Sequence, residues 1–257
     1  MRLVRAGTGL AAVVITLCLV ACGGGEKKPP KTDPASDASG KVRLAESYLR
    51  ASRYSDALQA MDQAIALQPD NARYRNFQGQ ILFLAGRDAP SEQALRKALE
   101  IDPYLSDAHN NLGALYDRMG RKDEAEKEFK LALADPGYPT PEKAYLNLGM
   151  LYVSQGRDDE ALRSMRRAVE MNPKYFQAHF QLASLLDRTG KLEEAAREYE
   201  VATPESRGSG DFQYRLGFTY YRLQNYPKAR EHLAKVLEMS PGSDNAVKAN
   251  EILETIR

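Results

Sequence analysis

The chain has 257 residues, of which 43% are hydrophobic and 28% charged, so it can bury a substantial core beneath a well-solvated surface. Its 36 Lys and Arg residues balance 35 Asp and Glu residues and are interleaved with them, which argues against a nucleic acid as partner. The absence of Trp and the wealth of Ala, Leu, Glu, Arg and Lys predict an all-α protein.

Residues 1–21 have a different character from the rest of the chain. Arg2 and Arg5 precede an apolar run from Ala6 to Ala21, which is shorter than the ~20 residues that a membrane-spanning helix needs. A basic start followed by a short apolar run is typical of a secretory signal peptide. An uncleaved membrane anchor is the alternative interpretation of this segment.

Both cysteines of the chain, Cys18 and Cys22, fall at the end of that run. The stretch Leu19-Val20-Ala21-Cys22 resembles the lipobox of bacterial lipoproteins. The resemblance implies cleavage before Cys22 and lipidation of its thiol, with Cys18 leaving in the signal peptide. Two buried apolar cysteines in an ordinary signal are the alternative. Gly23 resembles the residue that follows the cysteine in lipoproteins sorted to the outer membrane, so the expected location is the periplasmic side of a Gram-negative outer membrane.

Residues 22–40 are expected to form a flexible polar tether. The sequence GGGEKKPPKTDPASDASG after the cysteine is rich in Gly, Pro and Ser and has no large apolar residue. Such a composition cannot bury enough apolar surface to collapse. The two or three acyl chains of a lipoprotein would then hold a folded body close to its membrane.

From residue 41 to residue 241 the chain repeats itself. The repeats are seen by comparing NLGALYDRMGRKDEAEKEFKLAL, residues 111–133, with NLGMLYVSQGRDDEALRSMRRAV, residues 147–169. A small residue recurs at intervals of 34, 34, 36, 34 and 34 residues, at Ala45, Gly79, Gly113, Gly149, Ala183 and Gly217. A period of 34 residues predicts helical hairpins that stack into a solenoid.

The residue types at fixed places in each period are similar to those of the tetratricopeptide repeat. A small residue allows two helices to approach closely, a bulky residue follows three positions later, and a glycine ends the first helix. The resemblance implies a right-handed α-solenoid of six hairpins over residues 41–241. Residues 242–257 are expected to form a capping helix, because Ala246, Ala249, Leu253 and Ile256 fall on one stripe.

The repeats contain few groups suited to catalysis. His109, His179 and His232 are far apart in the sequence and have no second ligand at helical spacing, so we expect neither a metal site nor a catalytic histidine. The chain also lacks a P-loop and a nucleophile elbow. We therefore expect no enzyme activity, no catalytic residues, no cofactor and no small-molecule substrate.

A protein partner is expected instead, bound in the concave groove that first-helix residues line in tetratricopeptide-repeat proteins. The residues at those positions are more apolar than expected for a groove that only contacts water, and an exposed apolar patch indicates a protein partner. The alternative is that they only support neighbouring helices. The residues predicted to contact a partner are Asn111, Leu146, Asn147, Met150, Val153, Phe180, Tyr214, Phe218 and Tyr221.

A lipidated Cys22, a short tether, six repeats and a capping helix together resemble the layout of the type IV pilus secretin pilotins, the PilF, PilW and Tgl group. That resemblance implies an outer membrane assembly factor that binds the secretin subunit and promotes its localisation and multimerisation. A periplasmic scaffold lipoprotein that recruits peptidoglycan or other envelope-biogenesis enzymes is the alternative, since it would use the same groove.

Overall fold

The computed structural model describes residues 34–206 and 209–256. The predicted signal peptide, Cys22 and most of the predicted tether lie outside these residues. The described part is all-α, as predicted, and contains helices α1 to α13, with bounds Pro34–Arg50, Tyr54–Leu67, Ala72–Leu84, Asp88–Ile101, Ser106–Arg118, Lys122–Leu133, Pro141–Ser154, Asp158–Met171, Phe176–Arg188, Leu192–Ser206, Gly210–Arg222, Tyr226–Met239 and Asp244–Thr255. No helix of this part is long and apolar enough to cross a bilayer.

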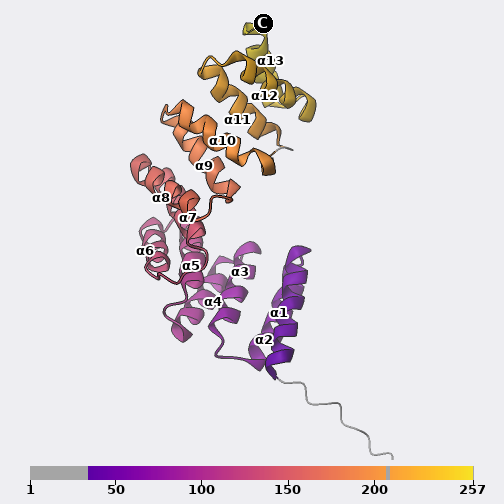
Figure 1. Cartoon of the computed structure of the whole chain (residues 1–257). Helices are drawn as coiled ribbons and strands as arrows, with labels where there is room; N and C mark the ends of the chain where they lie inside the picture. The colour runs from indigo at the N-terminus through magenta and orange to yellow at the C-terminus, as the bar shows by residue number, and fades with distance from the viewer. Residues whose placement is uncertain (1–33, 207–208, 257) are drawn as a thin grey trace, which may run out of the picture. The chain divides into compact units, whose positions relative to one another are not determined.

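The helices form six consecutive hairpins, α1–α2 to α11–α12, followed by the single helix α13 (Figure 1). The second helix of each hairpin contacts the first helix of the next one, and the first helices α3, α5, α7 and α9 also contact one another in sequence. Each hairpin therefore buries its apolar faces against its neighbours in the chain, as a repeat architecture requires.

The turns inside the hairpins share one backbone conformation. Gly86, Gly120, Gly156 and Gly190 have φ between 71° and 80°, in the left-handed region that glycine adopts at little cost. Ser52 and Gln224 take the same place in the first and last hairpins, with φ of 56° and 58°. The packing of the two helices therefore imposes the left-handed conformation at this turn in all six hairpins, even where the sequence has no glycine.

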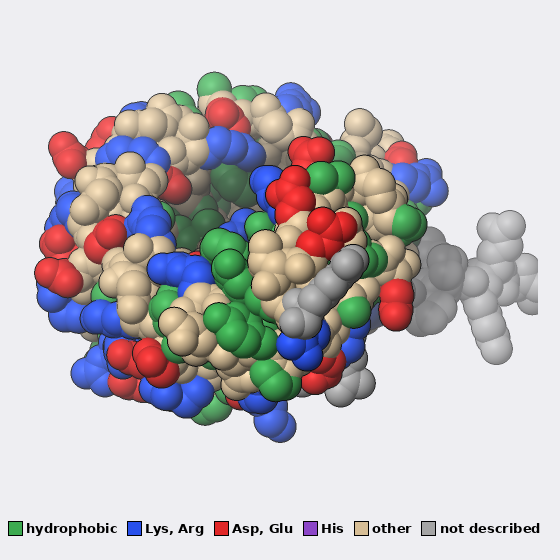
Figure 2. All heavy atoms as spheres, turned by 90° about the horizontal axis from the view of Figure 1, so that it is seen from above, with side chains coloured by type: hydrophobic (Ala, Val, Ile, Leu, Met, Phe, Trp, Pro, Cys, Tyr) green, Lys and Arg blue, Asp and Glu red, His purple; other side chains and the backbone are tan. Residues whose placement is uncertain are grey.

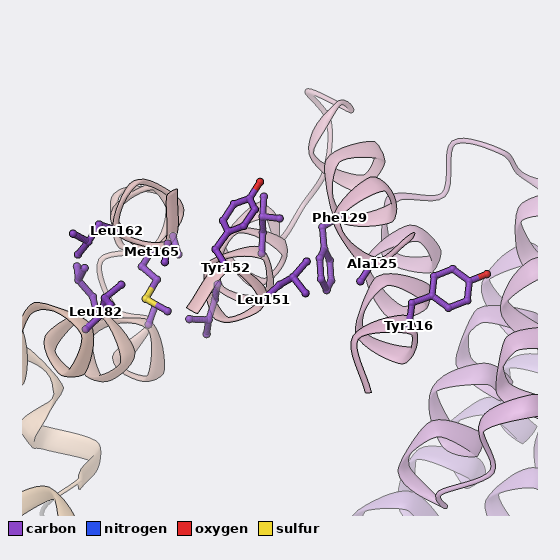
Figure 3. Close-up of a cluster of buried hydrophobic side chains, with 14 of the residues drawn as sticks. Tyr116, Ala125, Phe129, Leu151, Tyr152, Leu162, Met165 and Leu182 are labelled. Atoms are coloured by element: carbon purple, nitrogen blue, oxygen red, sulfur yellow. The ribbon is translucent and has the colours of Figure 1, made fainter. Parts of the chain in front are cut away.

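The recurring small residue marks the closest approach within a hairpin. A Cβ atom added at Gly113 of α5 would lie 2.7 Å from the Phe129 ring of α6. Figure 3 shows Phe129 in the buried cluster, with Leu162 and Met165 of α8 pointing toward Leu182 of α9. In the second hairpin, Ser91 takes the position that Ala125 and Ala161 have in the next two hairpins. It is fully buried and donates a hydrogen bond of 2.8 Å from Oγ to the carbonyl of Gly79.

Two seams between neighbouring hairpins carry the same polar group, which we call the seam triad. The hydroxyl of Tyr152 and the guanidinium of Arg157 both donate to Glu126 of the preceding hairpin, at 2.9 and 2.6 Å. Burial raises the pKa of Glu126, but hydrogen bonds from Arg157, Lys130 and Tyr152 outweigh this and lower the pKa to about 2.

The seam before it contains the equivalent triad of Glu92, Tyr116 and Arg121. The Tyr116 hydroxyl lies 3.1 Å from Glu92, and Arg121 Nη1 lies 3.0 Å from the same carboxylate. The guanidinium of Arg121 also covers the Tyr116 ring at 4.0 Å. These contacts join residues 24 to 31 positions apart, and so link one hairpin to the next.

The beginning of the folded part differs from the prediction. The tether was expected to extend to residue 40, but α1 already begins at Pro34, and Ala38 is fully buried. Once the packed part of α1 has formed, each further helical residue costs little, so a polar composition does not stop the helix. At the other end, Ala246 and Ala249 of α13, together with Ile256 directly after it, belong to the buried cluster of the last hairpins.

Candidate functional site

The candidate binding surface lies on α7, α9 and α11, the first helices of the last three hairpins. These helices carry eight of the nine predicted contact residues, and the ninth, Asn111, lies on α5. Figure 2 shows a hollow with hydrophobic side chains inside it and charged side chains around it. We call the surface formed by the partly exposed residues of α7, α9 and α11 the inner face.

Two predicted residues of α7 line a pocket of about 270 Å³. Met150, which is 41% exposed, and Val153 form one side of it. Gln181, Ser184 and Arg188 of α9 form the other side, and none of these three was predicted from the sequence. These three positions lie 34 residues after residues 147, 150 and 154, so the repeat period itself was the signal that could have found them.

Leu146 was predicted as a contact residue, and this prediction is wrong. The side chain is only 1% exposed and belongs to the main hydrophobic cluster. Phe180 of α9 is partly buried, with its ring centroid 5.7 Å from that of Tyr199 and 5.9 Å from that of Phe212. Both residues occupy first-helix positions that neighbouring helices cover, which is the supporting role left open by the sequence.

The two predicted asparagines have partners inside the protein. Asn111 of α5 donates to Asn76 Oδ1 of α3 at 2.9 Å, and Asn147 of α7 donates to Asn110 Oδ1 of α5 at 3.0 Å. These bonds tie consecutive first helices together. Each of the two amide groups uses one N–H in this contact and keeps its second N–H and its carbonyl oxygen.

An aromatic row occupies α11. Tyr214, Phe218 and Tyr221 follow one another at intervals of four and three residues, which places them on one side of the helix. The rings of Tyr214 and Phe218 stack with centroids 5.8 Å apart, and those of Phe218 and Tyr221 with centroids 6.2 Å apart. Tyr226 of α12, which sequence reasoning missed, extends the row with a centroid 6.3 Å from that of Tyr221. All four side chains keep exposed surface.

Charged groups next to these aromatic rings are paired. Arg215 donates to Asp211 at 2.9 Å and to Ser184 Oγ at 3.3 Å, and Arg222 donates to Asp187 at 2.8 Å. Burial raises the pKa of the Tyr214 hydroxyl, with a smaller contribution from a nearby glutamate, so it stays protonated and able to donate. The inner face thus combines apolar surface with neutralised charge, which suits a partly apolar polypeptide segment.

The histidines connect helices within their own hairpins. His109 Nδ1 lies 2.7 Å from Glu128, and His179 Nδ1 lies 2.6 Å from Glu198. His232 Nδ1 lies 2.8 Å from the side-chain oxygen of Gln213. Within residues 34–206 and 209–256, no three His, Cys, Asp or Glu side chains are grouped so that they could hold a metal ion.

The chain belongs to the tetratricopeptide-repeat family. Family models of this repeat match residues 42–106, 94–127, 146–211 and 210–243. Domains of this fold are typically non-catalytic and mediate protein–protein interaction.

Among solved structures, the chain is similar to PilW, described as a widely conserved type IV pilus biogenesis factor. The TM-score is 0.71 and the identity 26%, covering 85% of this chain and 97% of PilW. It shares the fold of Pseudomonas aeruginosa PilF, with a TM-score of 0.76 and 16% identity over 85% of this chain and 98% of that one. A repeat-containing thioredoxin of Arabidopsis thaliana, TTL4, is 30% identical over 36% of this chain, which spans only 14% of that relative.

Proposed function

We propose that this protein is a pilotin: an outer membrane lipoprotein that binds the secretin subunit of a type IV pilus through the inner face and promotes its localisation and multimerisation. The likeness to PilW, which extends over nearly the whole of that chain, supports a role in pilus biogenesis. The observation that carries the binding role is the presence of two partly apolar surfaces on the first helices of consecutive hairpins, the pocket of α7 and α9 and the aromatic row of α11.

The proposed membrane attachment rests on the sequence around Cys22. A lipid on this residue would keep the repeats and the membrane together, so that a bound secretin subunit is delivered to the bilayer at high effective concentration. The protein would act without catalysis, by holding its partner in the place where it assembles.

The inner face has enough apolar surface for a specific partner. Met150, Val153, Phe218 and Tyr221 already bury part of their surface, so each would contribute at most about 1.5 to 3 kcal/mol on full burial. Their sum is comparable to the roughly 4 to 15 kcal/mol that association costs in lost freedom. Further contacts, such as polar ones from Gln181 beside the pocket, therefore have to supply the net affinity.

Capture of the secretin subunit by the purified full chain tests the binding role. Met150→Gln and Phe218→Asn are expected to reduce capture at least about tenfold, since each removes a buried apolar contact. Met171→Gln is the matched control, because this methionine of α8 is 50% exposed and lies outside the pocket. Capture that is unchanged by Met150→Gln and Phe218→Asn would refute the inner face as the binding surface.

Cys22→Ala tests the membrane role separately. The variant is expected to leave the membrane fraction and to lose secretin multimers from the outer membrane, while its purified form still captures the subunit. Unchanged membrane enrichment and secretin assembly would contradict the proposed anchor. Recovery of peptidoglycan enzymes without any secretin would instead favour the scaffold function.

A further inference from the structure

A pocket of about 740 Å³ lies at the seam between the first two hairpins, away from the inner face. Its lining includes Leu58 of α2, Arg75 and Leu82 of α3, and Arg87 and Pro90 at the start of α4. Two carboxylates also line it: Asp62 accepts a hydrogen bond of 2.8 Å from the side chain of Gln78, and Glu100 is paired with Lys97. We call it the first-seam pocket. It occupies the place in this seam where the next two seams carry the seam triad.

Arg87 is the structural equivalent of the arginines of the two seam triads. Each of the three arginines follows a glycine with positive φ and immediately precedes the second helix of its hairpin. The backbone N–H of Arg87 donates to the carbonyl five residues earlier at 2.9 Å, as do those of Arg121 at 2.8 Å and Arg157 at 2.9 Å. The three side chains therefore leave the backbone from equivalent positions.

The two triad arginines each bind two carboxylates. Arg121 pairs with Glu92 across the seam and with Glu124 three residues ahead. Arg157 does the same with Glu126 and Glu160. In both seams, the arginine at this position of the repeat therefore forms ion pairs with two carboxylates.

Arg87 has neither of these partners. The position 34 residues before Glu92 is Leu58, and the residue three ahead of Arg87 is Pro90. Among the described residues Arg87 forms no ion pair, and its neighbour Asp88 is paired with Arg118 of α5. The first seam thus keeps the arginine and replaces both of its carboxylates by apolar side chains.

A second group in the same pocket also lacks a partner. The Nε of Arg75 is buried and has no hydrogen bond, and its Nη1 reaches only the side-chain oxygen of Gln78, at 3.5 Å. An unsatisfied buried donor is costly unless an acceptor is supplied. By contrast, the two other cations of the lining, Arg96 and Lys97, are paired with glutamates.

We propose that the first-seam pocket binds an acidic segment of a protein partner, whose carboxylates take the places around Arg87 that Glu92 and Glu124 take around Arg121. The protein itself shows in two equivalent seams that the arginine at this position pairs with glutamate. The apolar wall of Leu58 and Pro90 suits the methylene groups of such a side chain. This site is separate from the inner face and adds a second contact surface to the proposed function.

The test measures fluorescence anisotropy of a labelled decaglutamate peptide with the full chain purified in detergent. Binding is expected, and Arg87→Gln should weaken it at least about tenfold, as the loss of a bidentate charge-assisted pair does. Arg163→Gln is the matched control, because this exposed arginine of α8 also forms no ion pair with a described residue. Leu58→Glu supplies an internal carboxylate and should abolish peptide binding.

Several outcomes would overturn the proposal. One is an absence of binding, and another is an equal effect of Arg87→Gln and Arg163→Gln, which would indicate attraction by net charge alone. A third is undiminished peptide binding by the Leu58→Glu variant, provided that circular dichroism shows this variant to be folded. If the Leu58→Glu variant is unfolded, the comparison of Arg87→Gln with Arg163→Gln decides the test. Inorganic phosphate and phosphatidylglycerol vesicles are added as competitors of the labelled peptide. Displacement at an anion concentration lower than the concentration of free glutamate side chains needed for the same effect would assign the pocket to phosphate instead of carboxylate.

Discussion

Replacing Gly113 by alanine is expected to destabilise the third hairpin, although alanine is the better helix former. The added Cβ would lie 2.7 Å from both Cδ1 and Cε1 of Phe129, whereas carbon atoms normally approach to about 3.5 Å. The ring is 1% exposed and enclosed by the main cluster, so it cannot move away freely.

The magnitude follows from two opposing effects. Overpacking of a dense core typically costs about 1 to 3 kcal/mol, and the gain from glycine to alanine inside a helix is about 1 kcal/mol. Because a flat ring meets the new methyl group with two atoms at once, we expect the upper part of that range. Gly113→Ala should therefore lower the free energy of unfolding by about 1 to 2 kcal/mol and Tm by about 2 to 8 °C.

A matched variant separates packing from helix propensity. Gly149→Ala would place its Cβ 2.7 Å from Cγ of Met165, whose unbranched side chain can take another rotamer, and 3.4 Å from the carbonyl oxygen of Ala161. The first hairpin already contains this pairing, with Ala45 and Met61 buried in one cluster. Gly149→Ala should thus be neutral or stabilising in the same urea titration.

The double variant Gly113→Ala/Phe129→Met provides the decisive comparison. In the Phe129→Met background the alanine should no longer be destabilising, which gives a coupling free energy of about 1 kcal/mol or more in the double-mutant cycle. If Gly113→Ala alone raises stability as much as Gly149→Ala does, the close approach to the ring has no energetic weight and the reasoning is refuted.

Three further predictions concern single groups. The folded-state pKa of Glu126 is about 2, below its ordinary value of 4.5, so its stabilisation is present above pH 4.5 and is lost as pH falls towards 2; urea midpoints measured across this range should fall more steeply for the wild type than for Glu126→Gln. Burial lowers the pKa of His109, but the hydrogen bond to Glu128, together with smaller contributions from neighbouring groups, raises it by more than burial lowers it, so the pKa lies above the ordinary value of 6.5. Its stabilisation is therefore complete below pH 6.5 and is lost as pH rises through the raised pKa, so the stability difference between wild type and His109→Gln should shrink from pH 6 to pH 9. Gln224 has φ of 58°, and Gln224→Gly should stabilise by about 0.5 to 1 kcal/mol, whereas Gly156→Gln should cost about 1 to 2 kcal/mol, both measurable by thermal unfolding.

Much of the inner face could be predicted from the repeat period. The period identified α7 and α11 as lining helices, and Met150, Val153 and the aromatic row do retain exposed surface. The period did not distinguish Leu146 from Met150, since both are apolar first-helix positions and only the neighbouring helices determine which one is covered.

The sequence by itself determined the class of this protein. Small residues at a spacing of 34 specify hairpins because only they allow two helices to touch, and this local rule requires no knowledge of distant contacts. The polar character of residues 34–40 was the exception, because a helix that is already nucleated extends through such residues.

Only the tertiary structure decided which polar groups remain available to a partner. Asn111 and Asn147 look equally free in the sequence, yet each is already bonded to an asparagine 35 or 37 residues away. Arg87 and Arg121 look alike as well, but one faces leucine and proline and the other two glutamates. The reason is that pairing between hairpins depends on side chains about one repeat apart, whose meeting is set by how the helices stack.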